Sequence, residues 1–385
     1  MNQSITLESQ RLDHSSSPGL SRRRLYLSMT LGLVLFICFV PLILKRWGPA
    51  SLDDLIRSHG GEIEYSHPWT SFLGPQFGGI KSISIPNSAD YQIDDEFINS
   101  LGEQRHLSVL TLGNAENPSL VTDQGLTALK NYPLQYLSIT GGSFTDSGFN
   151  QLQKIPTLST LSLYDSEITG EQLQTTPAWT KLEILQLSGS KITDNGLKNI
   201  SAIPNLFFLN ISNSTFDEDS FRHLSNLTKL SDLNLNNSIF SAGSLRHLAA
   251  IKSLRALTMQ GNAINDDHVK QIANVKQITF LMLDHSKVTD QGLVALQKIK
   301  NLEQLFLSHT NITDAGVKHL TEIKTLQRLD LANTQITDAA METLLQIPQL
   351  KELDLQDLRL SAATIESLRN AGIKVNSGEQ NVVQQ

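Results

Sequence analysis

The chain has 385 residues, of which 39% are hydrophobic, 6% aromatic and 18% charged, and its formal net charge is −7. Its one cysteine, Cys38, excludes a disulfide framework or a cysteine-based metal site within one chain. Six basic but only two acidic residues lie in residues 1–46, so the remainder is more acidic than the chain as a whole. Because nucleic-acid binding needs a basic footprint, we expect no nucleic-acid partner.

The N-terminal segment predicts a membrane anchor. Residues 1–21 are polar and rich in Ser, which predicts a disordered cytoplasmic tail. Residues 25–44 run for 20 positions without a charge, long enough to cross a bilayer core of about 30 Å. Three arginines precede this stretch, and Lys45, Arg46 and Trp47 come directly after it. Residues 22–47 are therefore predicted to form one transmembrane helix that acts as a signal anchor.

The topology of this segment leaves two alternatives. Counting nearby basic residues gives four before the apolar stretch and three after it, which favours a cytoplasmic N-terminus by a small margin. A cleaved signal peptide is the alternative, since Gly48 and Ala50 are small residues at a suitable spacing. Both predict that the rest of the chain lies on the extracytoplasmic side, periplasmic or at the cell surface. An uncleaved segment predicts a single-pass membrane protein.

Residues 48–78 have a pattern that differs from that of residues 79–375. Residues 51–56 have the pattern of a short capped helix, which the Gly60-Gly61 pair ends, and residues 62–65 alternate like a strand. A repeat array needs a cover over its first unit, so this segment is predicted to be an N-terminal cap.

Residues 79–375 repeat with a nearly fixed period. Two looser copies of 27 residues begin at Ile80 and Leu107, and ten copies of 24 residues come after them, giving about twelve repeats. The frame of each regular copy is LxxLxLxx[S/T/N]x[I/V/F]TDxGLxxLxxI. Such a period indicates a solenoid, in which each unit buries its apolar face against its neighbours. Residues 376–385 are a polar tail. The ten openers are Leu134, Leu158, Leu182, Leu206, Leu230, Leu254, Ile278, Leu302, Leu326 and Leu350.

The frame of one repeat predicts its local structure. LxxLxL alternates like a short strand with its Leu side chains pointing inward. The Ser or Thr at the ninth position can bond backbone groups of the neighbouring turn. In the TDxG segment, Thr or Asp can cap the next helix, and Asp suits the positive N-terminus of that helix. We therefore predict an α/β leucine-rich-repeat solenoid, or horseshoe, with a concave parallel sheet and convex helices.

The motifs ITDNGL at 192–197, VTDQGL at 288–293 and ITDAGV at 312–317 resemble a known class of repeats. They are similar to the TDxGL leucine-rich repeats of membrane-anchored proteins in planctomycete-type bacteria. LIRSHGGEIEY at 55–65 and FLGPQFGGIKSISI at 72–85 look like the segment that precedes the repeats in those proteins. The resemblance covers residues 50–375. It implies a protein-interaction scaffold and carries no shared catalytic residues. Related repeats occur in F-box substrate adaptors, but no F-box-like module precedes the repeats here.

The third, fifth and seventh positions of each repeat are predicted to point out of the concave sheet, with the eighth at its rim. These positions are mostly small or polar in the first regular repeats and charged in the last ones, as at Arg328, Asp330, Glu352 and Asp354. Large apolar side chains among them indicate an interaction site. Phe280, Met282 and Phe306 fall at neighbouring positions of adjacent predicted strands, so we expect them to form one patch. Cross-strand packing without a ligand is the alternative. The predicted partner-binding residues are Tyr164, Phe208, Phe280, Met282, Asp284, His285, Phe306 and His309.

Chemistry beyond binding has little support in the sequence. His285 and His309 occupy the same position in successive repeats, but two histidines without a third strong ligand are weak evidence for a metal. The chain contains no GxSxG, P-loop, HExxH or GxGxxG motif. We therefore expect neither enzymatic activity nor a small-molecule cofactor.

The sequence thus predicts a membrane-anchored extracytoplasmic scaffold whose concave face binds a protein or peptide. The alternative is a structural cell-envelope protein that self-associates or binds wall polymer.

Overall fold

The computed structural model describes residues 52, 56–57, 60–65, 80–85, 92–174, 179–261, 263–378 and 382–383. The chain divides into two compact units, residues 1–55 and 56–385. Leu52 is the only described residue of the first unit, so the predicted tail (1–21) and anchor (22–47) lie outside the described residues. None of the helices among the described residues is long and apolar enough to cross a membrane.

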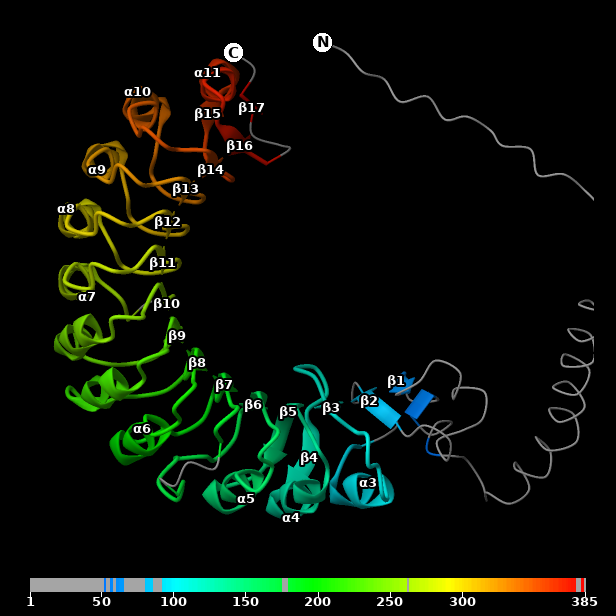
Figure 1. Cartoon of the computed structure of the whole chain (residues 1–385). Coiled ribbons are helices and arrows are strands. Elements are labelled where there is room, and N and C mark those ends of the chain that lie inside the picture. Colours follow the sequence, from blue (N-terminus) through cyan, green and yellow to red (C-terminus); the bar gives the residue numbers. More distant parts are fainter. Residues whose placement is uncertain are drawn as a thin grey trace, which may run out of the picture. The chain divides into compact units, whose positions relative to one another are not determined.

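Within residues 56–385, one sheet of 15 strands lines the inner side of an arc (Figure 1). Each strand from β2 to β14 pairs in parallel with the next along the array, and Cα partners lie 24 residues apart in the regular repeats, as for Leu281 and Leu305. The strands are β1 Glu62–Tyr65, β2 Ile80–Ile85, β3 Val109–Leu112, β4 Ser119–Thr122, β5 Tyr136–Ser143, β6 Thr160–Tyr164, β7 Ile184–Gln186, β8 Phe208–Asn210, β9 Asp232–Asn234, β10 Ala256–Thr258, β11 Phe280–Met282, β12 Gln304–Phe306, β13 Arg328–Asp330, β14 Glu352–Asp354 and β16 Lys374–Asn376.

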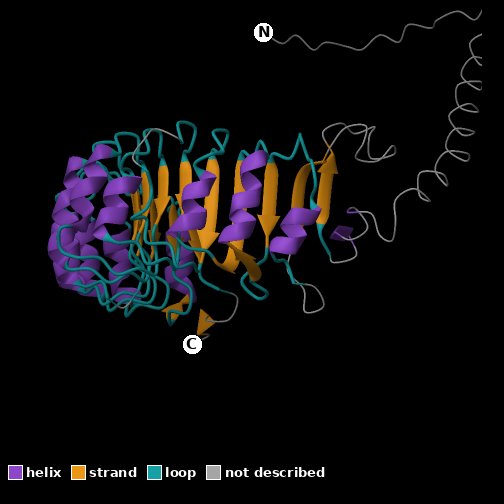
Figure 2. Ribbon diagram, turned by 90° about the horizontal axis from the view of Figure 1, so that it is seen from below, coloured by secondary structure: helices purple, strands orange, loops and turns teal. Residues whose placement is uncertain are grey.

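Short helices cover the outer side of the sheet (Figure 2). The α-helices are α3 Asp95–Ser100, α4 Asp123–Ala128, α5 Asp146–Leu152, α6 Asp194–Ile200, α7 Asp266–Ile272, α8 Asp290–Leu296, α9 Asp314–Leu320, α10 Met341–Leu344 and α11 Ala362–Asn370. The 3-10 helices are η3 Leu129–Asn131, η4 Ser220–Asn226, η5 Ala242–Ala250 and η6 Asp338–Ala340. The predicted concave sheet and convex helices are thus confirmed, although two of the central repeats carry 3-10 helices.

The two ends of the sheet differ. At the N-terminal end, β1 pairs with β2 antiparallel and so covers the edge of the first repeat. Much of the predicted cap (48–78) lies outside the described residues. At the C-terminal end, α11 leads into β16, the last parallel strand. A further short strand, β17 (Val382–Val383), lies within the predicted polar tail and pairs with β15 (Leu360–Ser361).

The core consists of the repeated aliphatic positions. In the repeat that opens at Leu302, the side chains of Leu302, Leu305, Leu307, Ile312 and Leu320 are all fully buried. At the ninth position, hydroxyls bond backbone groups of the neighbouring repeat as expected: Ser214 Oγ donates to the Ser190 carbonyl oxygen (3.0 Å). These contacts satisfy polar groups that stacking removes from water.

A second row of contacts joins successive repeats through the Thr-Asp pair of the motif. Thr caps its own helix as predicted; Thr313 Oγ1, for example, accepts from the Ala315 amide. The Asp reaches further than predicted, because it bonds the Thr of the next repeat. The Thr313 amide donates to Asp290 Oδ1 (2.9 Å) and its hydroxyl donates to Asp290 Oδ2 (2.7 Å).

The same pair of bonds recurs through much of the array and forms what we call the carboxylate ladder. At Thr122, Thr145, Thr289, Thr313 and Thr337 the carboxylate satisfies an amide at the start of a helix, where its charge also interacts favourably with the helix dipole. The ladder joins Asp95 to Thr122, Asp123 to Thr145, Asp146 to Thr169, Asp266 to Thr289, Asp290 to Thr313 and Asp314 to Thr337.

The ladder also explains the glycine of the TDxG motif. A Cβ atom at Gly292 would lie 2.6 Å from Asp266 Oδ1, and one at Gly316 would overlap Asp290 Oδ1. Both glycines lie in helices, so the constraint is the close approach of the preceding carboxylate rather than an unusual backbone conformation.

The central repeats lack the ladder because their motifs lack the Thr-Asp pair. Gly170 and Ala242 stand where the frame has Asp, and Asp217 and Ser241 stand where it has Thr. There Arg222 pairs with Asp194 (2.8 Å) and Arg246 with Asp219 (2.6 Å) on the surface. Inside, a column of four rings spans the gap, with neighbouring centroids 5.3–5.6 Å apart: Phe216, Phe221, Phe240 and His268.

Replacing Asp290 with Ala should lower the free energy of unfolding by about 2–3 kcal/mol, because two charge-assisted hydrogen bonds are lost and the Thr313 amide loses its partner. The matched control is Asp194→Ala at the same repeat position, where the loss should stay below about 1 kcal/mol because its partner Arg222 is exposed. Urea unfolding of both variants measures the difference, and equal losses would contradict the role of the ladder.

Candidate ligand-binding surface

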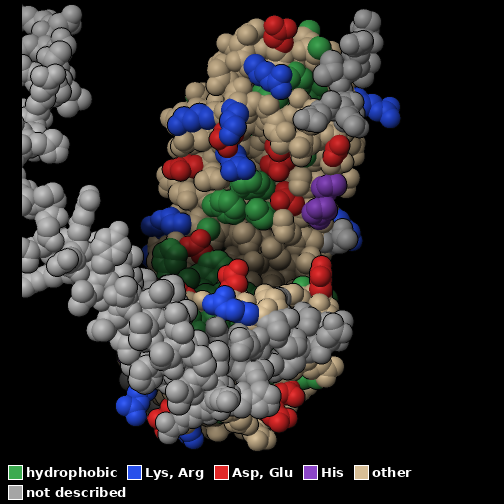
Figure 3. All heavy atoms as spheres, turned by 90° about the vertical axis from the view of Figure 1, so that its right-hand side faces the viewer, with side chains coloured by type: hydrophobic (Ala, Val, Ile, Leu, Met, Phe, Trp, Pro, Cys, Tyr) green, Lys and Arg blue, Asp and Glu red, His purple; other side chains and the backbone are tan. Residues whose placement is uncertain are grey.

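The sheet register brings the outward positions of the repeats into rows that run across the strands. The fifth position of each repeat gives the row Met282, Phe306, Asp330 and Asp354 over β11 to β14. The third position gives the parallel row Phe280, Gln304, Arg328 and Glu352. Figure 3 shows hydrophobic side chains gathered on the concave face beside acidic and basic ones.

Three of the predicted residues form one apolar patch. Met282 and Phe306 are direct neighbours in the register, and the rings of Phe280 and Phe306 lie 5.1 Å apart at an angle of 39°. Phe306 is only 9% exposed, whereas Phe280 and Met282 are half-buried. We call these three residues the aromatic patch. Phe306 forms its floor, and Phe280 and Met282 present its surface.

Arg328 borders the patch on the C-terminal side. Its guanidinium carbon lies 5.2 Å from the centroid of the Phe306 ring, within the range of a cation–π interaction. Its Nε lies 3.6 Å from Glu352 Oε2, and Lys374 Nζ lies 3.2 Å from the other Glu352 oxygen. The charged residues of the third-position row are therefore paired with one another.

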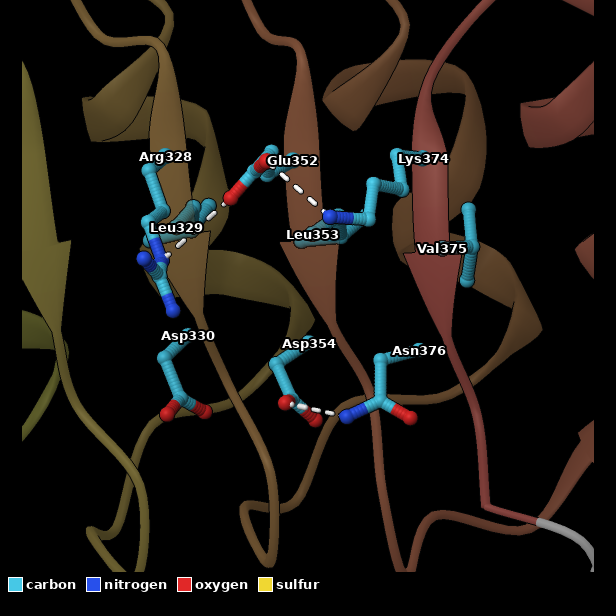
Figure 4. Close-up of a pocket in the computed structure, with 9 residues that line it drawn as sticks. All are labelled: Arg328, Leu329, Asp330, Glu352, Leu353, Asp354, Lys374, Val375 and Asn376. Atoms are coloured by element: carbon cyan, nitrogen blue, oxygen red, sulfur yellow. Dashed lines mark hydrogen bonds and ion pairs between the residues drawn. The ribbon is translucent and has the colours of Figure 1, made fainter. Parts of the chain in front are cut away.

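The fifth-position row carries two neighbouring carboxylates beside the patch. Asp330 and Asp354 occupy paired positions on β13 and β14 and line a shallow cavity of about 380 Å³ (Figure 4). Burial raises the pKa of the Asp330 carboxyl, against a hydrogen bond from the Ala332 amide that lowers it. The carboxylates of Asp354 and Asp284 raise this pKa further, and Arg328 opposes them more weakly. Asp330 thus stands in a local field of negative charge.

Asp284 lies in a different place from the one predicted. It is only 6% exposed, and its carboxylate accepts from the Ser308 amide (2.8 Å) and from Gln260 Nε2 (3.1 Å). These bonds join three neighbouring repeats. Asp284 therefore supports the sheet from within, although its seventh position predicted a side chain that points out of the concave sheet.

His285 and His309 stack at the edge of the concave face. Their rings are 4.1 Å apart and nearly parallel, and both side chains are exposed. Their φ angles are 55° and 54°. The eighth position is left-handed in most regular repeats, where Asn, Asp or Gly also occurs, and these residue types tolerate that conformation. The left-handed backbone conformation at the eighth position therefore explains in part why His occurs there.

Tyr164 and Phe208 lie apart from the aromatic patch. Phe208 is on β8, three strands from Phe280, and pairs in register with Ile184 and Asp232. Tyr164 is on β6, where its hydroxyl donates to Gln186 Oε1 (3.0 Å) and burial raises its pKa. The structure thus brings Phe280, Met282 and Phe306 together and His285 next to His309, but it does not join Tyr164 or Phe208 to them.

The predicted set omitted the charged neighbours of the patch. Once each strand is placed beside the strand 24 residues later, Arg328 and Asp330 lie on the strand next to Phe306, and Asp354 lies one strand further on, so the repeat frame already contained this signal. No group of three or more His, Cys, Asp or Glu side chains suited to a metal ion occurs within the described ranges.

Comparisons with known proteins bear on the fold. A family model described as a leucine-rich repeat matches residues 180–201, 298–320 and 323–345. No curated protein matches the sequence.

Several solved structures are similar to the chain at low identity. An internalin (inlF) from Listeria monocytogenes is 17% identical, with a TM-score of 0.39 over 71% of this chain and 86% of the internalin chain. PEPR1, in the complex PEPR1–AtPEP1, is 14% identical, with a TM-score of 0.43 over 85% of this chain and 54% of that one. The ectodomain of the plant receptor kinase GASSHO1/SCHENGEN3 from Arabidopsis thaliana, in complex with CASPARIAN STRIP INTEGRITY FACTOR 2, is 17% identical. Its TM-score is 0.35 over 70% of this chain and 37% of that one.

The chain spans about half of the second of these proteins and just over a third of the third. The family match in three of the repeats, which have the same stacked strands and helices as their neighbours, shows that the chain contains leucine-rich repeats.

Proposed function

We propose that this protein is a binding scaffold that holds a protein or peptide on the concave face of its repeats, over β11 to β14. We further propose that residues 22–47 anchor it in a membrane, with the repeats on the extracytoplasmic side. The aromatic patch is the single observation that carries the binding proposal.

The contrast with the rest of the fifth-position row supports a ligand for the patch. From β5 to β10 this row consists of small or polar residues, and only β11 and β12 place large apolar side chains in it, at Met282 and Phe306. The preceding members of the row are Ser138, Ser162, Gln186, Asn210, Asn234 and Thr258. Apolar side chains with exposed surface in a polar setting are typical of an interaction site.

Cross-strand packing accounts for only part of the patch. Phe306 is covered by Phe280 and Arg328 and acts mainly as a packing residue. Phe280 and Met282 retain exposed surface on the same sheet as the charged residues of β13 and β14, two and three strands away along the rows. An apolar centre with a charged border is the usual anatomy of a protein interface.

The anchor proposal rests on the sequence alone. Residues 25–44 are uncharged and of membrane-spanning length, and arginines precede them. The acidic character of the remaining chain disfavours broad docking on anionic lipid, so contact with the membrane is assigned to this segment.

The double variant Phe280→Ala/Met282→Ala should lose most of the capture of a specific partner when the full-length chain is cross-linked in extracts of its source cells. A loss of about tenfold or more is expected for residues at the centre of an interface. Tyr136→Ala is the matched control, because Tyr136 is 36% exposed at the third position of a different strand in the same sheet. Its capture should match that of the native chain.

Unchanged capture by the double variant, together with a lowered melting temperature, would assign the patch to packing and reject the binding proposal. Concentration-dependent self-assembly with no captured partner would favour the structural envelope role instead.

Protease added to intact spheroplasts should digest residues 50–385, because the proposed topology exposes the repeats outside the cytoplasm. Detection with an antibody against the repeats measures the loss, and a cytoplasmic protein serves as the control for intact cells. Repeats that stay protected until the membrane is permeabilised would reverse the proposed topology.

A further inference from the structure

We propose that the ligand segment recognised by this surface is an extended peptide in which a large apolar residue and a Lys or Arg lie two positions apart. The apolar side chain packs on Phe280, Met282 and Phe306, and the cation lies between the carboxylates of Asp330 and Asp354. This inference rests on the proposed binding function and specifies the chemistry of the partner.

Charge is segregated between the two rows of the sheet. In the third-position row, Glu352 pairs with both Arg328 and Lys374, so its negative charge is satisfied. The fifth-position row has no basic member from Met282 to Asn376, and its two neighbouring carboxylates are Asp330 and Asp354. The negative charge beside the patch is therefore concentrated along one row.

The carboxylates of Asp330 and Asp354 keep unused bonding capacity. Asp330 Oδ1 accepts from the Ala332 amide (2.9 Å), and no hydrogen bond or ion pair from a described residue reaches its Oδ2. Asp354 accepts only from neutral groups among the described residues, the Gln356 amide (3.0 Å) and Asn376 Nδ2 (2.7 Å). Figure 4 shows the two carboxylates on neighbouring strands, open to the same cavity. A cationic group is the complement that this pair lacks.

Arg328, the basic residue on the same strand as Asp330, interacts with other groups. Arg328 places its guanidinium over the Phe306 ring and its Nε towards Glu352, so it pairs with neither Asp330 nor Asp354. Burial raises the pKa of Asp330, the carboxylates of Asp354 and Asp284 raise it further, and Arg328 lowers it only weakly. A ligand cation would relieve this repulsion, whereas an acidic ligand would increase it.

The spacing along the fifth-position row matches that of an extended peptide. Adjacent strands lie about 4.8 Å apart, so the midpoint between Asp330 and Asp354 lies roughly 7 Å from Phe306 along the row. An extended peptide rises about 3.4 Å per residue, so side chains two positions apart are about 7 Å apart on one face. Both distances agree. The row therefore matches a peptide segment that has an apolar residue, then any residue, and then Lys or Arg. The segment can run in either chain direction.

A phage-displayed library of random heptapeptides, selected on the purified full-length chain, tests the motif directly. We expect enriched peptides to carry Lys or Arg two positions from Leu, Ile, Met or Phe. For one enriched peptide, labelled with a fluorophore, Asp330→Asn/Asp354→Asn should weaken binding about tenfold, and added salt should weaken binding to the native chain more than to this variant.

The matched control is Asp165→Asn/Asp232→Asn, which removes one carboxylate directly after β6 and one on β9 and leaves the row beside the patch intact. Its affinity for the same peptide should equal that of the native chain. Asp330→Asn keeps an oxygen that can accept from the Ala332 amide, so the fold should be unaffected. If Asp330→Asn/Asp354→Asn melts at the same temperature as the native chain, its loss of affinity reflects binding and not stability.

Different outcomes separate the two proposals. Enriched peptides without a basic residue, whose binding needs Phe280 and Met282 but survives Asp330→Asn/Asp354→Asn, would overturn this inference and leave the binding function in place. A library without enrichment, or binding that survives loss of both the patch and the carboxylates, would overturn both.

Discussion

Each repeat of this protein depends on its neighbours, and the bond that makes this dependence specific is the carboxylate ladder. One Asp satisfies the amide and the hydroxyl of a Thr in the next repeat, as Asp290 does for Thr313. Because both groups lie at the start of a helix, the bond fixes where that helix begins and how closely it approaches the previous one. The glycine of the same motif is the space that this carboxylate requires.

The array uses two kinds of junction. In most repeats that have the Thr-Asp pair, an α-helix starts after the capping Thr and the ladder connects it to the next repeat, as in α8 and α9. In the two repeats of η4 and η5, which lack the pair, the helices are 3-10 without side-chain caps, and the column from Phe216 to His268 joins the repeats through ring packing. Hydrogen bonds of the ladder fix distance and angle, whereas ring packing tolerates small displacements, so the two regions should differ in rigidity.

The proposed binding surface lies where the ladder is present. The strands β11 to β13 belong to repeats that Asp266, Asp290 and Asp314 connect, and Asp284 adds a bond from within the sheet. The aromatic patch and the Asp330–Asp354 pair therefore stand on a support whose strand spacing is held from behind. A surface held in this way loses less conformational entropy when a ligand binds.

The repeat period was sufficient to predict the strands, the buried leucines and the contact between Phe280 and Phe306, since all of them result from stacking equal units. It also predicted Thr as a helix cap, because a cap is a local feature. The role of Asp290 was not predicted, because its partner lies 23 residues on and meets it only after stacking. The burial of Asp284 was not predicted either, since its bonds to Gln260 and Ser308 come from two other repeats. Tyr164 and Phe208 were included in the predicted binding set by residue type, and the strands between them and β11 separate them from the patch.

Amide hydrogen exchange along the array tests most directly whether the ladder makes the repeats that carry the proposed binding surface more rigid than the central repeats. If it does, α8 and α9 exchange more slowly than η4 and η5, and Asp290→Ala speeds exchange in α9 while leaving η4 unchanged. Equal protection of all four helices in the native chain, or slower exchange in η4 and η5, would contradict the claim that the ladder makes the repeats of the binding surface more rigid.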